Sequence, residues 1–230
     1  MKFTSPVYSA VSGSIAGITY SHNRGGMYAR ARAIPVNPNT DPQVSARDAM
    51  KNGVVAWGTL TLAQRSAWED YAANVPMLDR LGNSRPLTGQ QQFLRTYLAR
   101  SAAGAGISPV LVAPTIFNLG TFTPFTGEGS AATDQVAVTF DDNDAWASTD
   151  GGFATIALGI QQGPGVNFYK SPFSINDILV GSALAGPTSP QQCVYGAPLT
   201  SGNKIWVKYV VGQADGRVST PNIIECGIGA

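Results

Sequence analysis

The clearest strand signal in this sequence is Lys204-Ile205-Trp206-Val207-Lys208-Tyr209-Val210-Val211, which is rich in β-branched and aromatic residues. The run Gln135-Val136-Ala137-Val138-Thr139-Phe140 has the same character. Shorter strand candidates are 110–112, 153–160, 166–169, 192–195 and 222–226. Turns rich in Gly, Pro and Asp separate them, with long polar loops at 141–152 and 181–190. Residues 107–230 are therefore predicted to form an immunoglobulin-like or fibronectin-like β-sandwich.

Upstream of this region, the spacing of apolar residues changes from the period of strands to that of helices. The pattern Thr-x-x-Gln begins at Thr40, Thr61 and Thr88, each time before an apolar stripe. It matches a capping box, in which the threonine hydroxyl accepts a hydrogen bond from the N3 amide. Residues 39–106 are therefore predicted to form a small three-helix region. The stripe of the first helix is expected to be Ala46, Met50, Val54 and Trp57. The core of the region is expected to contain Trp57, Trp68, Tyr71, Phe93 and Tyr97.

Residues 1–38 predict an extended β-hairpin arm, which gives the chain an α+β class overall. Two strand-like runs, 14–20 and 27–34, flank a loop rich in Gly and Asn. Because a two-stranded hairpin is only marginally stable in water, we expect it to pack on another copy of the chain. The expected assembly-interface residues are Ile15, Ile18, Tyr20, Arg24, Met27, Tyr28, Arg30 and Arg32.

Composition excludes two classes of protein. The chain has 230 residues, of which 43% are hydrophobic and only 13% are charged, so it is not a disordered chain. It contains no apolar run of about 20 residues, so no membrane span is expected. Residues 1–106 carry a net charge of +6 and residues 107–230 a net charge of −5. This asymmetry either reflects two unrelated surfaces or favours head-to-tail contacts between copies.

The sequence offers little for catalysis. His22 is the single histidine and lies in the expected hairpin turn, so no triad can be assembled, and we expect neither an enzyme nor a cofactor. The weak calcium candidates Asp142, Asp144 and Asp150 lack the spacing of an EF-hand, which favours a solvated turn. Arginines are interleaved with carboxylates in the first half of the chain, a pattern that disfavours sequence-specific nucleic-acid binding.

Two aromatic residues in the predicted loops could contact a ligand, namely Trp146 and Tyr169. An indole in a polar loop either folds back under the sheet or meets a partner. Cys193 and Cys226 are expected to be buried free thiols. The alternative is a disulfide between them that forms after release from the cell. No secretory signal is expected at the N-terminus, because polar residues interrupt its apolar ones.

One combination of motifs resembles a known group of proteins. It consists of Trp57-x-x-Leu60-Thr61-x-x-Gln64-Arg65-x-x-Trp68-x-x-Tyr71-Ala72, preceded by Gly13-Ser14-Ile15-Ala16-Gly17 and Asn37-Pro38-Asn39-Thr40. This combination is similar to uncharacterised proteins found in bacterial genomes and in phage or prophage gene clusters. The resemblance covers roughly residues 12–100. It implies a virion or virion-like structural protein and does not say which part of the particle, so the tail and the capsid surface are both candidate locations. The lack of a secretory signal predicts that the protein is made in the host cytoplasm.

Two hypotheses follow from the sequence. In the first, the chain is a self-assembling structural subunit of a phage or phage-like particle, built by exchange of the arm between copies. Its partners would be copies of itself and other virion proteins, without a membrane. In the second, the C-terminal sandwich is a module that binds a glycan or a host surface through its loops.

Overall fold

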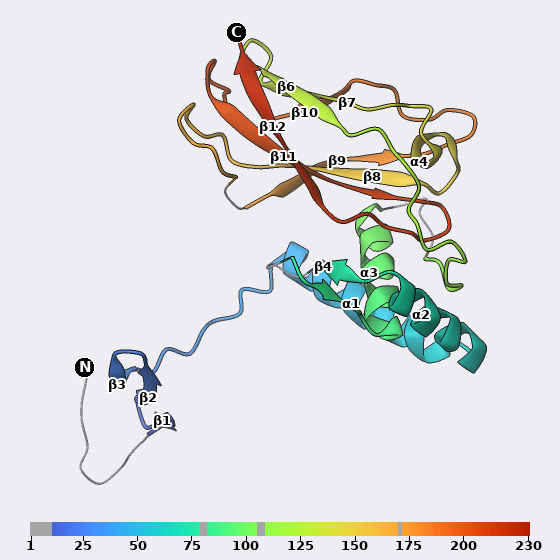
Figure 1. Ribbon diagram of the computed structural model, residues 1–230. Helices are drawn as coiled ribbons and strands as arrows, with labels where there is room; N and C mark the ends of the chain where they lie inside the picture. Colours follow the sequence, from blue (N-terminus) through green and yellow to red (C-terminus); the bar gives the residue numbers. More distant parts are fainter. Residues whose placement is uncertain (1–10, 79–81, 105–108, 170–171) are drawn as a thin grey trace. The chain divides into compact units, whose positions relative to one another are not determined.

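The computed structural model describes residues 11–78, 82–104, 109–169 and 172–230, and the chain divides into two compact units, Met1–Val44 and Ser45–Ala230 (Figure 1). Within the described ranges the chain is mixed α/β, with four helices and one large, nearly closed β-sheet. Residues 1–10 of the expected arm and 105–106 of the expected helical region lie outside the described residues. No helix within the described ranges is long and apolar enough to cross a membrane.

The first unit contains a small antiparallel sheet in the order β1-β2-β3, which we call the N-terminal sheet. Its strands are β1 (Gly13–Ile15), β2 (Ile18–Asn23) and β3 (Gly26–Ala31). The β2–β3 turn is closed by a hydrogen bond from the Gly25 amide to Asn23 Oδ1 (2.9 Å). The expected strand 14–20 is interrupted at Ala16, whose φ of 51° reverses the chain and produces the additional strand β1.

Three longer helices follow: α1 (Asp41–Thr59), α2 (Leu62–Asn74) and α3 (Gly89–Ala102). Between α2 and α3 lies a short ribbon of β4 (Met77–Leu78) and β5 (Ser84–Arg85). The capping boxes predicted at Thr61 and Thr88 are confirmed. Each threonine hydroxyl accepts a hydrogen bond from the backbone amide of the glutamine at N3, and the Oε1 of that glutamine accepts one from the backbone amide of the threonine. These caps satisfy amides that would otherwise lack partners at the helix starts.

The cores of α2 and α3 meet at aromatic rings. The Phe93 ring lies 5.4 Å from that of Trp68 and 5.5 Å from that of Trp57, while Tyr71 packs edge-on against Trp68 at 5.7 Å. Tyr97 is partly buried, with its ring 5.9 Å from that of Phe93. All five aromatic residues expected in the helical core thus belong to one cluster.

Helix α1 packs on α3 through Gly53, its one buried residue. A Cβ at this position would come within 2.9 Å of Leu94 Cδ2, so the close approach requires glycine. The expectation that Ala46, Met50 and Val54 face the core is therefore wrong. The helix turns its smallest side chain toward α3 and leaves these three residues exposed.

The large sheet has the strand order β10-β7-β6-β12-β11-β8-β9. Neighbouring strands are antiparallel except β12 and β6, which pair in parallel at Ile228 and Gly129. The strands are β6 (Thr126–Ser130), β7 (Gln135–Thr139), β8 (Phe153–Leu158), β9 (Ser174–Val180), β10 (Gln191–Val194), β11 (Lys204–Gly212) and β12 (Asn222–Gly229).

Side chains of the two edge strands connect the ends of this sheet. Asn176 Nδ2 on β9 donates to the Val194 carbonyl on β10 (2.7 Å), and Gln191 Nε2 donates to Asp177 Oδ2 (2.5 Å). The enclosed core holds apolar residues from every strand of the large sheet except β6, whose glycines line it. The sheet is thus nearly closed around a single core.

In residues 109–230, where the large sheet lies, two expected strands are absent and two observed strands, β6 and β9, were not expected. Leu111, in the expected strand 110–112, accepts a hydrogen bond from Trp68 Nε1 (3.2 Å) and so packs on the helices instead. Residues 166–169 form an irregular loop. The centre of β6 is Gly-Glu-Gly, which lacks the β-branched residues that indicate a strand. The pairing of β9 with β8 shifts register beside Asp177, so the alternation of apolar and polar residues along β9 is interrupted. A short helix, α4 (Ala145–Ser148), occupies the expected loop 141–152.

Helix α3 is joined to the sheet by buried polar side chains within the second unit. Arg95 donates to the carbonyls of Val218 (3.0 Å) and Ser219 (2.6 Å), and Thr96 Oγ1 donates to that of Gly216 (3.1 Å). Arg100, only 3% exposed, donates to the carbonyls of Gln213 (3.0 Å) and Gly151 (3.2 Å). These bonds satisfy four backbone carbonyls between β11 and β12 and that of Gly151 before β8, so they join the helices to the large sheet within one unit.

Replacing Arg100 with alanine should lower the free energy of unfolding by about 2–4 kcal/mol, because two buried carbonyls lose their charged donor. Arg85→Ala, at an exposed position of β5, is the matched control and should change stability by less than about 0.5 kcal/mol. Urea denaturation followed by circular dichroism measures both. Equal stabilities of the two variants would contradict this account of the joint.

Gln92 of α3 is fully buried, and neither its amide nitrogen nor its amide oxygen has a hydrogen-bond partner within the described ranges. Gln92→Met keeps the length of the side chain and removes both polar atoms. It should raise the free energy of unfolding by about 1–2 kcal/mol. Gln90→Met, at a partly exposed position of the same helix, serves as the control. A loss of stability on Gln92→Met would show that the amide is bonded in solution.

Candidate assembly surface

The pairing register divides the N-terminal sheet into two faces. Residues directly opposite each other in an antiparallel pair place their side chains on the same face, and next neighbours along a strand alternate. The pairs His22–Met27, Tyr20–Ala29, Ile18–Ala31 and Ile15–Ile18 therefore share one face, which we call the apolar face. The polar face carries Ser14, Thr19, Ser21, Tyr28 and Arg30.

The eight expected interface residues do not all lie together. Ile15, Ile18, Tyr20 and Met27 belong to the apolar face, whereas Tyr28 and Arg30 belong to the polar face. Arg24 occupies the β2–β3 turn, and Arg32 follows the end of β3. Strand alternation is thus a signal by which the two sets can be separated from sequence alone.

The N-terminal sheet has no core of its own. No residue is buried in the described part of this unit, residues 11–44, and the Ile15 side chain is 71% exposed. A sheet with one apolar face must bury that face against a second layer to be stable. The described part of the first unit does not supply that layer.

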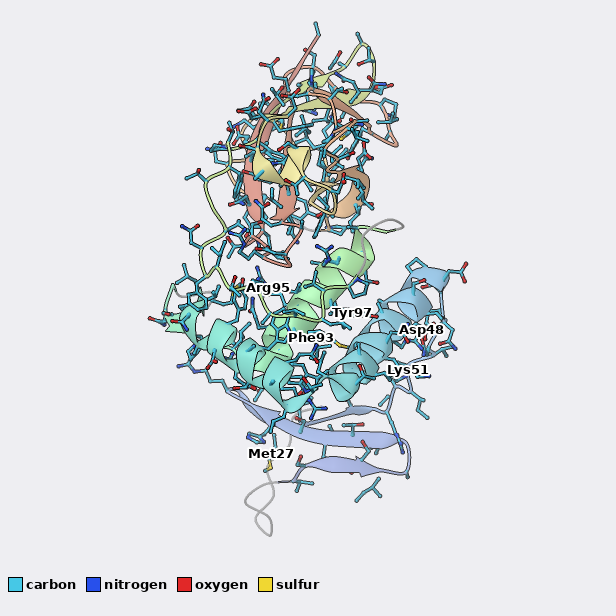
Figure 2. The ribbon with its side chains drawn as sticks, turned by 90° about the vertical axis from the view of Figure 1, so that its right-hand side faces the viewer. Met27, Asp48, Lys51, Phe93, Arg95 and Tyr97 are labelled. Carbon is cyan, nitrogen blue, oxygen red and sulfur yellow. The ribbon has the colours of Figure 1, made fainter. Side chains whose placement is uncertain are left out.

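A second exposed apolar surface lies on α1. Met50 is 45% exposed and Val54 is 46% exposed, and their i, i+4 spacing places them on one side of the helix. We call these two residues, together with Ala46, the α1 patch. Phe93 and Tyr97 point from α3 toward α1, whereas Asp48 and Lys51 point away from the other helices (Figure 2). The α1 patch is therefore exposed apolar surface that lies next to the side of α1 that packs on α3.

Of the two aromatic residues predicted to contact a ligand, Trp146 is fully buried. Its ring packs 5.6 Å from Phe125 and 5.3 Å from Phe140 in the core of the large sheet. The indole folds back under the sheet, so the interpretation of Trp146 as a ligand contact is wrong. Tyr169 is exposed, with its ring 5.9 Å from that of Phe173.

The calcium candidates do not converge. Asp144 Oδ2 accepts from the Thr123 amide (2.9 Å), and Asp150 Oδ1 accepts from the Ala183 amide (2.9 Å). Asp142 Oδ1 accepts from the side chain of Asn143 (3.0 Å). Across the described ranges, no three His, Cys, Asp or Glu side chains gather closely enough to hold a metal ion. These carboxylates instead fix the conformation of the loop around α4.

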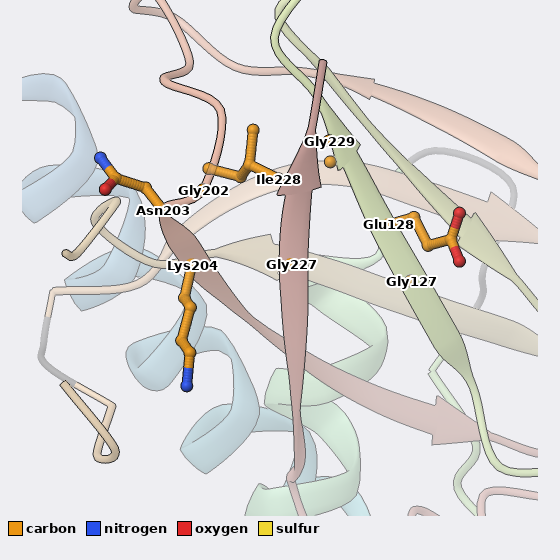
Figure 3. A pocket seen from close by; sticks show the side chains of 9 residues that line it. Gly127, Glu128, Gly202, Asn203, Lys204, Gly227, Ile228 and Gly229 are labelled. Atoms are coloured by element: carbon orange, nitrogen blue, oxygen red, sulfur yellow. The ribbon is translucent and has the colours of Figure 1, made fainter. Parts of the chain in front are cut away.

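A depression of about 570 Å³ opens where β6, β11 and β12 meet (Figure 3). Packing explains two of its five glycines: a Cβ at Gly127 would lie 2.6 Å from Cys226 Sγ, and one at Gly129 would lie 2.9 Å from Ile228 Cγ1. The charged side chains of Glu128 and Lys204 point away from one another. No converging set of polar groups is formed there that could perform chemistry.

Cys193 and Cys226 are both free and buried in the core of the large sheet. Burial raises the pKa of each thiol to about 12, with smaller contributions from Asp177 at Cys193 and from Glu225 at Cys226. Because the thiolate is the reactive form, neither cysteine is prepared for redox or nucleophilic chemistry.

Comparisons with known proteins add little to this geometry. No protein-family model matches the chain, and no curated protein matches it. The crystal structure of the adhesin domain of Epf from Streptococcus pyogenes is similar over 46% of this chain, with 14% sequence identity and a TM-score of 0.28. This chain covers only 31% of that one. A TM-score this low gives no basis for assigning a fold or a function.

Thiol labelling tests the two buried cysteines. At pH 8 the native protein should react with Ellman's reagent much more slowly than unfolded chain, and two thiols per chain should appear after unfolding without reductant. Folding raises both thiol pKa values from 9.0 to about 12, so the associated stability is present below pH 9 and is lost as the pH rises toward 12. Absence of free thiol after unfolding would instead establish a disulfide.

Proposed function

We propose that this protein is a self-assembling structural subunit, and that assembly proceeds by docking of the N-terminal sheet of one copy on another copy. The observation that carries the proposal is the apolar face of Ile15, Ile18, Tyr20 and Met27, which has no second layer among residues 11–44, the described part of its unit. Another copy of the chain can supply that layer, because copies are close together during assembly.

Charge supports contacts between unlike parts of two copies. The described part of the first unit contains Arg24, Arg30 and Arg32 against a single acidic residue, Asp41. Residues 107–230 carry a net charge of −5. Attraction between basic and acidic surfaces speeds encounter and sets orientation. It favours a heterologous contact, which generates rings or open tubes rather than closed dimers.

The proposal that the assembly is a phage or phage-like particle, at its tail or capsid surface, is supported by the tryptophan-containing motif of residues 57–72. Each motif position has a structural role. Leu60, Trp68, Tyr71 and Ala72 are buried. Thr61 and Gln64 cap α2, and the Arg65 guanidinium donates to the Gly58 carbonyl (2.8 Å). A motif that specifies a helical hairpin fits a structural protein better than an enzyme.

The finer description of the large sheet as an immunoglobulin-like or fibronectin-like sandwich is also a proposal. It is supported by the shared core, to which one half of the sheet contributes Val136, Val138 and Ile228, while the other half contributes Ile156 and Val207. An experimental structure that shows a round barrel without two opposed layers would contradict it.

A second candidate function is binding of a glycan or a host surface by the large sheet. Its support is the exposed pair Phe168 and Tyr169, next to Phe173. Phe173 packs against Gly159, which lines a depression of about 200 Å³ together with Asn176 and Tyr195. In this case the protein would be a monomer or small oligomer, and a glycan array would give signals that Tyr169→Ala removes.

Deletion of residues 1–35 tests the assembly function. The shortened chain retains the three hydrophobic clusters of the second unit and should be a folded monomer, whereas the full chain should form large particles. Light scattering coupled to size-exclusion chromatography gives the mass, and circular dichroism gives the fold. Normal particles from the shortened chain would rule out assembly through the N-terminal sheet.

A further inference from the structure

We propose that the side chains of Lys204 and Asn167 join in an amide bond with loss of ammonia, and that Glu225 carries the protons in this reaction. The structure brings these three side chains together from separate segments of the second unit. Lys204 Nζ donates a hydrogen bond to Asn167 Oδ1 (3.2 Å) and lies 2.9 Å from Glu225 Oε1. The inference concerns the large sheet and does not depend on the proposed assembly function.

Strand pairing places the lysine beside the carboxylate. Lys204 begins β11, and Glu225 of β12 pairs with Trp206, two residues further along β11. Residues two positions apart on a strand share a face of the sheet, so the lysine and the glutamate are diagonal neighbours on one face. This is the outer face, because the adjacent residues Ile205 and Cys226 belong to the enclosed core.

The irregular segment 159–169 brings the asparagine to this pair. The Gln162 amide donates to the Lys204 carbonyl (2.8 Å), and the Lys204 amide donates to the Gln162 carbonyl (2.9 Å), so the segment is attached to the start of β11. A bond from the Val166 amide to the Gly163 carbonyl (3.1 Å) then closes a turn, which Asn167 follows directly. These backbone bonds hold the lysine and asparagine side chains near each other.

The lysine is the least exposed of the three side chains. It is 23% exposed, against 45% for Glu225, and Trp206 on the same face is almost fully buried. Restricted freedom keeps the reacting groups together and raises their effective concentration. Asn167 is exposed, so ammonia released from it passes directly into solvent. Neither Asn167 nor Glu225 lines the depression formed by β6, β11 and β12, so the three side chains meet beside it.

The reaction balances without a further reagent. Glu225 takes a proton from the Lys204 ammonium group, and the resulting amine attacks Cγ of Asn167, the atom to which Oδ1 is bonded. The bond from Cγ to Nδ2 then breaks. The departing nitrogen receives the proton held by Glu225 and a second proton from the lysine nitrogen, and it leaves as an ammonium ion. One hydrogen stays on the new amide nitrogen, and Glu225 is again a carboxylate.

The mass of the purified full chain tests the bond. After denaturation, the protein should be lighter than its sequence by one molecule of ammonia. Lys204→Arg keeps a positive charge beside Glu225 but cannot form the amide, so it should have the full mass of its sequence. Lys208→Arg, on the same strand and the same face, is the matched control and should still show the loss. Glu225→Gln removes the proton carrier and should leave most of the fresh protein unreacted.

Digestion with trypsin locates the bond. This step is needed because an asparagine followed by glycine, such as Asn52, also loses ammonia when it closes a ring with the backbone. Trypsin does not cut after an acylated lysine, so residues 101–170 and 171–208 should stay joined in one branched peptide. Lys204→Arg should instead give the separate peptides 101–170 and 171–204.

The bond should also stabilise the fold, because it closes a loop between residues 37 positions apart and so restricts the unfolded chain. The melting temperature of Lys204→Arg should lie below that of the unchanged protein by on the order of 10 °C. The melting temperature of Lys208→Arg should change by less than about 3 °C. Circular dichroism during heating measures both.

The outcomes are distinct. A branched peptide that contains Lys204 and Asn167, and that is lost in Lys204→Arg but kept in Lys208→Arg, would establish the bond. The full sequence mass in fresh protein and after prolonged incubation at pH 8 would overturn the inference, as would a loss of ammonia that maps to other residues. Complete reaction in Glu225→Gln would remove Glu225 from the mechanism. None of these results depends on whether the protein forms particles.

Discussion

The second unit depends on the hydrogen bonds that helix α3 donates to the turn between β11 and β12. Arg95, Thr96 and Arg100 satisfy carbonyl oxygens at Gln213, Gly216, Val218 and Ser219, none of which pairs within a regular strand. Buried carbonyls without donors would be costly, and charged donors make the strongest of these bonds. The bonds hold the aromatic core of the helices and the core of the large sheet together in one unit. Helix α1 is attached to this unit because it packs on α3 through Gly53.

The N-terminal sheet has the opposite property. It has regular pairing and one apolar face, but the described part of its unit lacks a second layer and buries no residue. This uncovered apolar face is the observation on which the proposed assembly of several copies rests.

Local signals predicted much of this structure. The Thr-x-x-Gln pattern located the starts of α2 and α3 because a capping box needs only four consecutive residues. The apolar runs at β7 and β11 located central strands because both are rich in residues that favour strands. Strand β6 could not be found in the same way. Its Gly127 and Gly129 are required by side chains of β12, almost 100 residues away, and a local pattern contains no information about that contact.

The sequence by itself determined the helix starts, the alternating faces of the N-terminal sheet and the separation of charge, because each depends on residues close together in the chain. Only the tertiary structure decided that Trp146 is buried, that Met50 and Val54 stay exposed, and that the helices and large sheet form one unit. These properties depend on which distant residues come into contact. The close approach of Gly53 to Leu94, which lie 41 positions apart, places a glycine of α1 at its contact with α3, while Met50 and Val54 remain exposed.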